Sequence, residues 1–281
     1  MVTAACSDAA IGLNPDETPE VVALVTAVAD VASCESQGDE ATAALVDTLP
    51  GLVLMAGDIA YESGTSDEFA RCYDTSWGKH RDRTRPAPGN HEYVTDGAAP
   101  YFAYFGAAAG PAGRGYYSFD AGTWHIVSLN SNIDMSAGSP QETWLRDDLA
   151  KSGARCTLAF WHHPLFSSGF HGNNPSVAPL WRALEDAGAE IVVAGHDHHY
   201  ERFAPQSADG TPNAARGLRQ FVTGNGGRSL FPALFASANS ERRFDDGYGV
   251  LRLTLGEGRY EWRFVPVTSG QFADSGSGTC H

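Results

Sequence analysis

The chain has 281 residues, of which 42% are hydrophobic, and its formal net charge is -15 at pH 7. A chain of this size and composition can bury a large core, which excludes a disordered or fibrous protein and favours one α/β domain. The negative charge, with no run of Lys or Arg, opposes the counterion release on which nucleic-acid binding depends, so nucleic acid is not an expected partner. The longest apolar segment, 21–29, is too short to span a bilayer, which takes about 20 residues.

Residues 1–20 are largely polar and contain prolines, so we predict an N-terminal tail followed by a single domain over 21–281. Five cysteines show no CxxC pair, which argues against metal binding through sulfur and leaves disulfides open. Cys34 and Cys72 form the favoured pair, because each lies shortly after a loop that carries candidate site residues. The sequence shows no signal peptide, yet we expect a secreted or cell-envelope protein; its oligomeric state stays open.

Alternation of apolar runs with helical patterns predicts the central architecture. Strand-like runs cover 21–29, 52–56, 124–130, 157–161 and 191–194, and helical spacing covers 39–49, 66–77, 139–151 and 175–187. Strand followed by helix, repeated along the chain, predicts a largely parallel sheet. Ser139 before Pro140 has the order of an N-cap and a first-turn proline, so the third helix has a defined start.

The pattern changes after Tyr200. Segments 220–223, 248–255 and 259–267 are strand-like, and the turn 256–258 joins the last two into a predicted hairpin. Residues 268–281 are rich in Gly and Ser, which is typical of a closing loop held, if at all, by Cys280. The run GNGGRS at 224–229 lacks the spacing and the lysine of a P-loop, so we predict a tight turn near the cleft, where Arg228 can meet a substrate anion.

Five short polar clusters follow apolar runs or rigid turns. They are the end of VTAVAD, GDIAY, GNHEY, HHP and GHDHHYER, and they supply the candidates Asp30, Asp58, Tyr61, Asn90, His91, His162, His196 and His198. Because ligands gather beyond the carboxyl ends of strands in open parallel sheets, we expect these side chains to share one site. A carboxylate directly after a strand as apolar as LVLMA needs compensation, which a metal ion supplies. Oxygen and nitrogen donors in this mixture suit a pair of hard or borderline cations.

The ordered set resembles the calcineurin-like metallophosphoesterases, from Asp30 through GD, GNHE and HHP to GHDH, over about 21–202. Most of that superfamily has D-x-H as its first motif, but here Val31 and Ala32 follow Asp30. The missing histidine together with GDxxY resembles the purple acid phosphatase branch, in which a tyrosinate binds ferric iron. The resemblance implies an α/β fold, a four-layer α/β/β/α sandwich with two mixed sheets.

The resemblance also implies two metal ions, Fe(III) and a divalent ion that is Fe, Zn or Mn. Asp30, Tyr61 and His198 would hold one ion, Asn90, His162 and His196 would hold the other, and Asp58 would bridge them. His162 is preferred to His163 on the register of the family's H-x-P motif. His91 and His171 would be catalytic histidines outside the metal shell, each able to hydrogen-bond the phosphoryl group or help to protonate the leaving oxygen.

The implied reaction is hydrolysis of small phosphomonoesters by attack of a metal-bound hydroxide on phosphorus. Three alternatives stay open. The first is a phosphodiesterase with the same metal core, and the second is a non-catalytic module that binds metal or phosphate. The third is an enzyme with two divalent ions in which Tyr61 is not a ligand. Asp197, His199, Glu201 and Arg202 are candidates to orient the ligand imidazoles by hydrogen bonds.

Overall fold

A computed structural model describes residues 22–233 and 235–281. The predicted tail 1–20, with Cys6, and the first predicted strand residue, Val21, lie outside the described residues. Among the described residues, no helix has both the length and the apolar character needed to cross a membrane.

Within 22–233 and 235–281, thirteen strands form two mixed sheets of six and seven strands, in the orders β13-β12-β11-β1-β2-β3 and β10-β8-β9-β7-β6-β5-β4. The strands are β1 (Ala23–Val28), β2 (Leu52–Ala56), β3 (Thr84–Ala87), β4 (Tyr117–Ala121), β5 (Trp124–Ser128), β6 (Cys156–Phe160), β7 (Ile191–Ala194), β8 (Tyr200–Phe203), β9 (Arg219–Thr223), β10 (Ser240–Phe244), β11 (Gly249–Gly256), β12 (Arg259–Pro266) and β13 (Ser275–Thr279). Strands β1, β2 and β3 run parallel to one another, and so do β5, β6, β7 and β9.

The predicted helices are present, with one interrupted by a π turn. The α-helices are α1 (Gly38–Asp47), α2 (Ser66–Glu68), α3 (Asp74–Ser76), α4 (Ala99–Phe105), α5 (Pro140–Lys151) and α6 (Ala178–Asp186). A π turn, Phe69–Tyr73, joins α2 to α3, and 3-10 turns cover Gly78–Arg83, Glu92–Val94, Asp96–Ala98, Gly106–Ala109 and Pro175–Val177. The hydroxyl of Ser139 accepts a hydrogen bond from the Glu142 amide, which confirms the predicted cap of α5.

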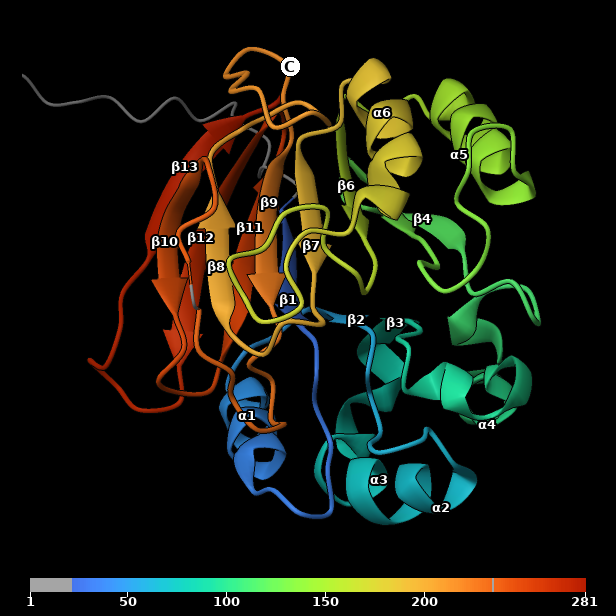
Figure 1. Cartoon of the computed structure of the whole chain (residues 1–281), viewed down its shortest axis with the longest axis vertical. Coiled ribbons are helices and arrows are strands. Elements are labelled where there is room, and N and C mark those ends of the chain that lie inside the picture. The colour runs from blue at the N-terminus through green and yellow to red at the C-terminus, as the bar shows by residue number, and fades with distance from the viewer. Residues whose placement is uncertain (1–21, 234) are drawn as a thin grey trace, which may run out of the picture.

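Three apolar clusters separate four layers. The first lies between the two sheets, where Val25 and Leu253 face Leu158 and Ile191. The second packs α1, the π turn and α4 on the six-stranded sheet, and the third packs α5 and α6 on the seven-stranded sheet. Figure 1 shows α5 and α6 together beside β6, away from α1 to α4. The predicted α/β/β/α sandwich is confirmed.

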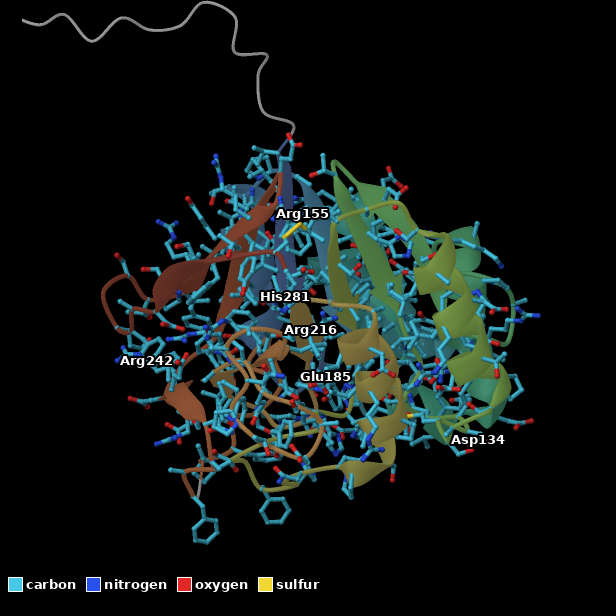
Figure 2. All side chains as sticks on the ribbon, turned by 90° about the horizontal axis from the view of Figure 1, so that it is seen from above. Asp134, Arg155, Glu185, Arg216, Arg242 and His281 are labelled. Carbon is cyan, nitrogen blue, oxygen red and sulfur yellow. A yellow bond between two sulfur atoms is a disulfide. The ribbon has the colours of Figure 1, made fainter. Side chains whose placement is uncertain are left out.

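The predicted hairpin is confirmed as β11 and β12, but the prediction of a closing loop over 268–281 is wrong in part. Residues Ser275–Thr279 form β13, which extends the sheet as an antiparallel neighbour of β12. Among the described residues the cysteines form two disulfides: the predicted Cys34–Cys72 pair and Cys156–Cys280, which ties the end of β13 to β6. Figure 2 shows a disulfide close to the labelled Arg155 and His281.

Candidate metal centre

The candidate residues lie together because five strands end at the same edge. Asp30 follows β1, Asp58 follows β2, and Asn90 follows β3 in the six-stranded sheet, whereas His162 follows β6 and His196 follows β7 in the other. Most of the candidates line one pocket of about 190 Å³, together with Glu62, Arg228, Ser229 and Phe231. Convergence at the carboxyl ends of parallel strands, in both sheets at once, brings together residues up to 168 positions apart, as from Asp30 to His198.

One group of donor atoms surrounds the phenol of Tyr61. Its oxygen lies 2.7 Å from Asp30 Oδ1, 3.2 Å from Asp58 Oδ2 and 3.2 Å from His198 Nε2. His198 Nε2 in turn lies 3.3 Å from Asp30 Oδ1. The side chains of Asp30, Tyr61 and His198 therefore point at a common centre that Asp58 borders.

A second group surrounds His162. Its Nε2 atom lies 3.1 Å from Asp58 Oδ2, 3.0 Å from Asn90 Oδ1 and 3.2 Å from His196 Nδ1. Asp58 Oδ2 is thus within 3.2 Å of a donor in each group. A single carboxylate oxygen between two clusters is the position of a bridging ligand.

The donor set fits a pair of ions. Ligands at about 2.1 Å from a metal and at right angles to one another are about 3 Å apart, which is the spacing between the atoms of each group. Asp30 is fully buried and Asp58 is 1% exposed. Two buried carboxylates that are close together need compensating positive charge. Asp30, Asp58 and His162 also form a cluster with ligand atoms within 4.8 Å of one another.

Backbone carbonyls set the orientation of two imidazoles. His162 Nδ1 donates to Ala56 O at 2.9 Å, and His198 Nδ1 donates to Ser229 O at 2.6 Å. Each bond leaves the Nε2 lone pair directed into the site, as metal-binding histidines require. This role was expected of Asp197, His199, Glu201 and Arg202, but in the structure these four side chains form no hydrogen bond with His162, His196 or His198. The prediction failed because a carbonyl oxygen has no signature in the residue type.

Charge pairing sets the protonation of the metal-free site. Burial raises the pKa of Asp58, but the charge of His162 outweighs burial and holds it below the usual range. Burial lowers the pKa of His162, and Asp58 reverses this effect, so the pKa rises to about 9. Burial and the charge of His162 lower the pKa of His196 to about 2, so His196 is a neutral donor. Burial and the carboxylates of Asp30 and Asp58 raise the pKa of Tyr61, so a phenolate here needs a strongly charged cation beside it.

The backbone at this site is strained. Asp30, Asp58 and His196 have φ of +59°, +50° and +72°, a region that L-residues other than Gly rarely adopt. Asp30 and His196 brace each other, because the amide of His196 donates to Asp30 Oδ2 at 2.8 Å. Such strain persists only where the surrounding structure imposes it, and it is concentrated at functional sites.

Glu92 is an important residue to which the sequence reasoning gave no role. Its buried carboxylate accepts hydrogen bonds from the amides of Asp58, Ile59, Ala60 and Gly89, at 2.7 to 3.2 Å. It therefore fixes the loop after β2 against the loop after β3. The sequence feature that could have indicated this role is the position of Glu92 in GNHE, directly after His91.

The two predicted catalytic histidines flank the pocket. His91 Nδ1 donates to Glu62 O at 2.6 Å, and its Nε2 lies 3.8 Å from Asp58 Oδ2. His171 Nδ1 lies 3.1 Å from Asp197 Oδ1, which also accepts from the His171 amide at 2.8 Å. Asp197 therefore orients His171, whose ring lies 4.2 Å from that of His196 between centroids.

Arg228 lines the pocket, as the position of GNGGRS after β9 suggested. Its Nη2 pairs with Glu62 Oε1 at 2.6 Å, and its guanidinium lies 5.3 Å from the centre of the Tyr61 ring. His163, the alternative to His162, instead has its Nδ1 2.8 Å from Ser131 Oγ, beside the cluster.

Known proteins match this architecture and this order of residues. The profile of the calcineurin-like phosphoesterases matches residues 23–200. The chain belongs to the calcineurin-like phosphoesterase family. Its curated relatives include purple acid phosphatase 15 of Arabidopsis thaliana, 30% identical over 199 residues, which cover 56% of this chain and 37% of that protein. The uncharacterized protein Rv2577 of Mycobacterium tuberculosis is 28% identical over 244 residues, covering 68% of this chain and 46% of that protein.

The fold of this phosphoesterase-family chain is also that of a solved plant enzyme. Purple acid phosphatase PPD1 from yellow lupin superposes with a TM-score of 0.76 over 92% of this chain and 54% of the lupin chain, at 18% identity. The similarity to purple acid phosphatase 15 supports the purple acid phosphatase-like branch that the motifs predicted. The chain spans about half the length, or less, of the relatives it matches.

Proposed function

We propose that this chain is a dinuclear metal-dependent phosphoesterase that hydrolyses small phosphomonoesters. The observation that carries the proposal is a pair of ligand-atom clusters that share one oxygen of Asp58. This oxygen lies about 3 Å from Tyr61 in one cluster and from His162 in the other. Family membership gives the phosphoester chemistry, and the preference for monoesters is our inference. The small pocket supports it, since its 190 Å³ suits the phosphoryl group alone, and a monoester leaves one substituent to place at the mouth whereas a diester leaves two.

In this proposal each cluster holds one ion. Asp30, Tyr61 and His198 would hold Fe(III), since carboxylate and phenolate are hard anionic ligands, and Asp58 would be shared by both ions. Asn90, His162 and His196 form the more neutral set, which suits a divalent ion: Fe, Zn or Mn. When bound, such a pair supplies Lewis-acid polarisation of phosphoryl oxygens and a water of lowered pKa.

The remaining polar side chains have separate tasks. His91 is held through Nδ1, so its Nε2 faces the pocket and can pass a proton to the leaving oxygen. His171, fixed by Asp197, can donate a hydrogen bond to the phosphoryl group from the side of His196. Arg228 adds positive charge at the mouth, where the anionic substrate enters.

We also propose a secreted or cell-envelope location. Two disulfides among the described residues support this, because disulfides persist in oxidising compartments and are rare in the cytosol.

Metal analysis and a pair of substrates test the function. Protein purified without added metal should contain two equivalents of metal and should hydrolyse p-nitrophenyl phosphate faster than bis(p-nitrophenyl) phosphate. A strong preference for the diester contradicts the monoesterase proposal. Binding of inorganic phosphate without hydrolysis of either ester would support the non-catalytic module instead.

Colour tests the role of Tyr61. A tyrosinate bound to Fe(III) absorbs visible light, so Tyr61→Phe should abolish the band while Tyr93→Phe, a change outside both donor clusters, should keep it. Iron-loaded protein without a visible band would remove Tyr61 from the ligand set and favour two divalent ions.

A further inference from the structure

Exposed apolar side chains gather around the pocket. Among the described residues, the large hydrophobic side chains that are exposed are Val22, Val94, Phe170 and Phe235, at 42%, 63%, 69% and 77%. Three of them lie on loops that carry pocket residues, because Val94 follows His91, Phe170 precedes His171 and Phe235 follows Phe231. Only Val22 lies elsewhere, before β1 and thus at the opposite end of that strand from Asp30. Apolar groups exposed around a polar pocket indicate a ligand surface.

One exposed member of this group, Phe170, connects to the metal-ligand cluster through the half-buried Phe231. Phe231 lies flat on His198, with ring centroids 4.3 Å apart and an interplanar angle of 7°. Phe170 lies 6.2 Å from Phe231 and 5.4 Å from His171. We call Phe170 and Phe231 the aromatic wall. It leads from the buried imidazole of His198 to the surface.

The two loops that carry the wall are fastened to each other and to the site. The Phe231 amide donates to His198 O at 3.1 Å. The Ser237 amide donates to Ser168 Oγ at 2.9 Å, and the Ser237 hydroxyl donates to Ser167 O at 2.8 Å. Surfaces that are ordered before binding lose less conformational entropy when a ligand arrives. The wall therefore has the support expected of a preformed binding surface.

The pocket is large enough for only one part of a phosphoester substrate. Its volume of about 190 Å³ is smaller than the roughly 300–1,000 Å³ of sites that enclose a whole organic ligand. Its lining includes Asn90, His91 and Arg228, which suit a charged phosphoryl group rather than an apolar substituent. A substituent on the ester oxygen must then lie at the mouth, where the aromatic wall is the apolar surface next to the pocket.

We propose that the preferred substrates are phosphomonoesters of aromatic alcohols, whose ring packs on the aromatic wall of Phe170 and Phe231. This inference rests on the proposed function, because it assumes that the pocket receives the phosphoryl group. Aromatic rings in contact contribute about 0.5–1.5 kcal/mol beyond the area they bury, which corresponds to a preference of about two- to tenfold over an aliphatic ring of similar size.

Non-hydrolysable phosphonates test the wall apart from catalysis. Binding of benzylphosphonate and cyclohexylmethylphosphonate to the metal-loaded protein is measured by calorimetry. We expect benzylphosphonate to bind about two- to tenfold more tightly. Phe170→Leu, which keeps an apolar side chain at an exposed position, should bring the ratio near one, and Val22→Ala, at the far end of β1, should leave the ratio unchanged.

The outcomes separate the two proposals. Equal affinities in the wild type, or a ratio that survives in Phe170→Leu, overturns the aromatic wall. Equal affinities together with a doubled mass in sedimentation that Phe170→Leu abolishes would assign the surface to a second copy, and this also overturns it. A ratio that falls in Phe170→Leu supports the wall even if p-nitrophenyl phosphate stays intact, in which case only the proposed hydrolysis is wrong.

Discussion

The amino and carboxyl ends of the parallel strands each carry a cavity, and the size of the cavity does not indicate which one is the candidate site. The amino end carries a hollow of about 660 Å³, lined by His125, Asp148 and Arg155, whereas the pocket at the carboxyl end has about 190 Å³. In the larger hollow, the two nitrogens of His125 contact carboxylates on opposite sides, Asp120 at 2.9 Å and Asp148 at 2.8 Å. In the smaller pocket, the donor atoms of several side chains point at shared centres. Convergence of donors distinguishes the candidate site.

Backbone geometry shows the same contrast. At the carboxyl end, Asp30, Asp58 and His196 adopt left-handed conformations, and a Cβ on Gly57 would lie 2.6 Å from the ring of His162. At the amino end, a Cβ on Gly153 would meet nothing within 4 Å. The left-handed conformations of three residues other than glycine at the carboxyl end indicate that the structure there is constrained by more than stability.

Removal of the disulfides should have the largest effect. Cys156–Cys280 closes a separation of 124 residues at the amino end, and Cys34–Cys72 closes 38 at the carboxyl end. Chain entropy predicts losses of about 5 and about 4 kcal/mol in the free energy of unfolding when each pair becomes Ala, measured by urea denaturation. Only loss of Cys34–Cys72 should also weaken metal retention, because Ala32 O accepts from the Tyr61 amide nearby. Equal metal loss in both variants would contradict the comparison.

Neutralising one carboxylate at each end separates them by activity. Asp58→Asn removes the shared anionic oxygen, and we expect hydrolysis of p-nitrophenyl phosphate to fall about 10²–10³-fold, or about 3–4 kcal/mol, the scale of losing one preorganised electrostatic group. Asp148→Asn should leave kcat/KM within about twofold, because the Asp148 carboxylate accepts hydrogen bonds from Ser118 and His125 at the larger hollow, away from both donor clusters. A comparable loss of activity in Asp148→Asn would place catalysis in the larger hollow and contradict the proposed site.

The dependence of stability on pH tests the role of Glu190 at the amino end. Burial raises the pKa of Glu190 from 4.5 to about 7, although its carboxylate accepts from the amides of Thr157 and His281. Between these values Glu190 binds more protons in the folded state than in the unfolded state, so its contribution to the free energy of unfolding falls by roughly 2–3 kcal/mol as pH rises from 4.5 to 7. In Glu190→Gln the decline should be smaller than in the wild type by about this amount, as measured by denaturation of both proteins at pH 4.5 and 7.5. Glu92 and Asp39, whose pKa burial also raises to about 7, contribute equally to both curves. An unchanged decline would show that another group is responsible.

Much of the site followed from the sequence because its chemistry resides in residue types. Asp, Asn and His after apolar runs are visible as letters, and the strand ends bring them together. The carbonyls of Ala56 and Ser229, which orient His162 and His198, are not visible in this way, since every residue has a carbonyl.

The strand β13 was missed for a different physical reason. Its sequence, SGSGT, has no apolar alternation and low intrinsic strand propensity. Its glycines are required by the neighbouring strand, because a Cβ on Gly276 or Gly278 would lie 2.3 Å from the ring of Trp262 or Tyr260. Pairing with β12 and the bond from Cys280 hold the segment in the sheet, and both are tertiary effects. Local sequence patterns predict strands whose own side chains form the apolar face of a sheet. They miss strands whose small residues only accommodate the side chains of a neighbouring strand.

The smallest effects are expected from one added methyl group at each end. In Gly89→Ala the new Cβ would lie 2.1 Å from Asp58 Oδ1 and 2.3 Å from Asp58 N, so the floor of the pocket must move. Overpacking of this kind costs about 1–3 kcal/mol of stability and should also weaken metal binding, because it displaces the shared carboxylate. Gly153→Ala has open space and should stabilise the fold by about 0.4–1 kcal/mol through the unfolded state. Thermal denaturation and metal titration of both variants measure the contrast. Full metal affinity in Gly89→Ala would show that metal binding does not depend on the present position of Asp58, which would contradict its bridging role.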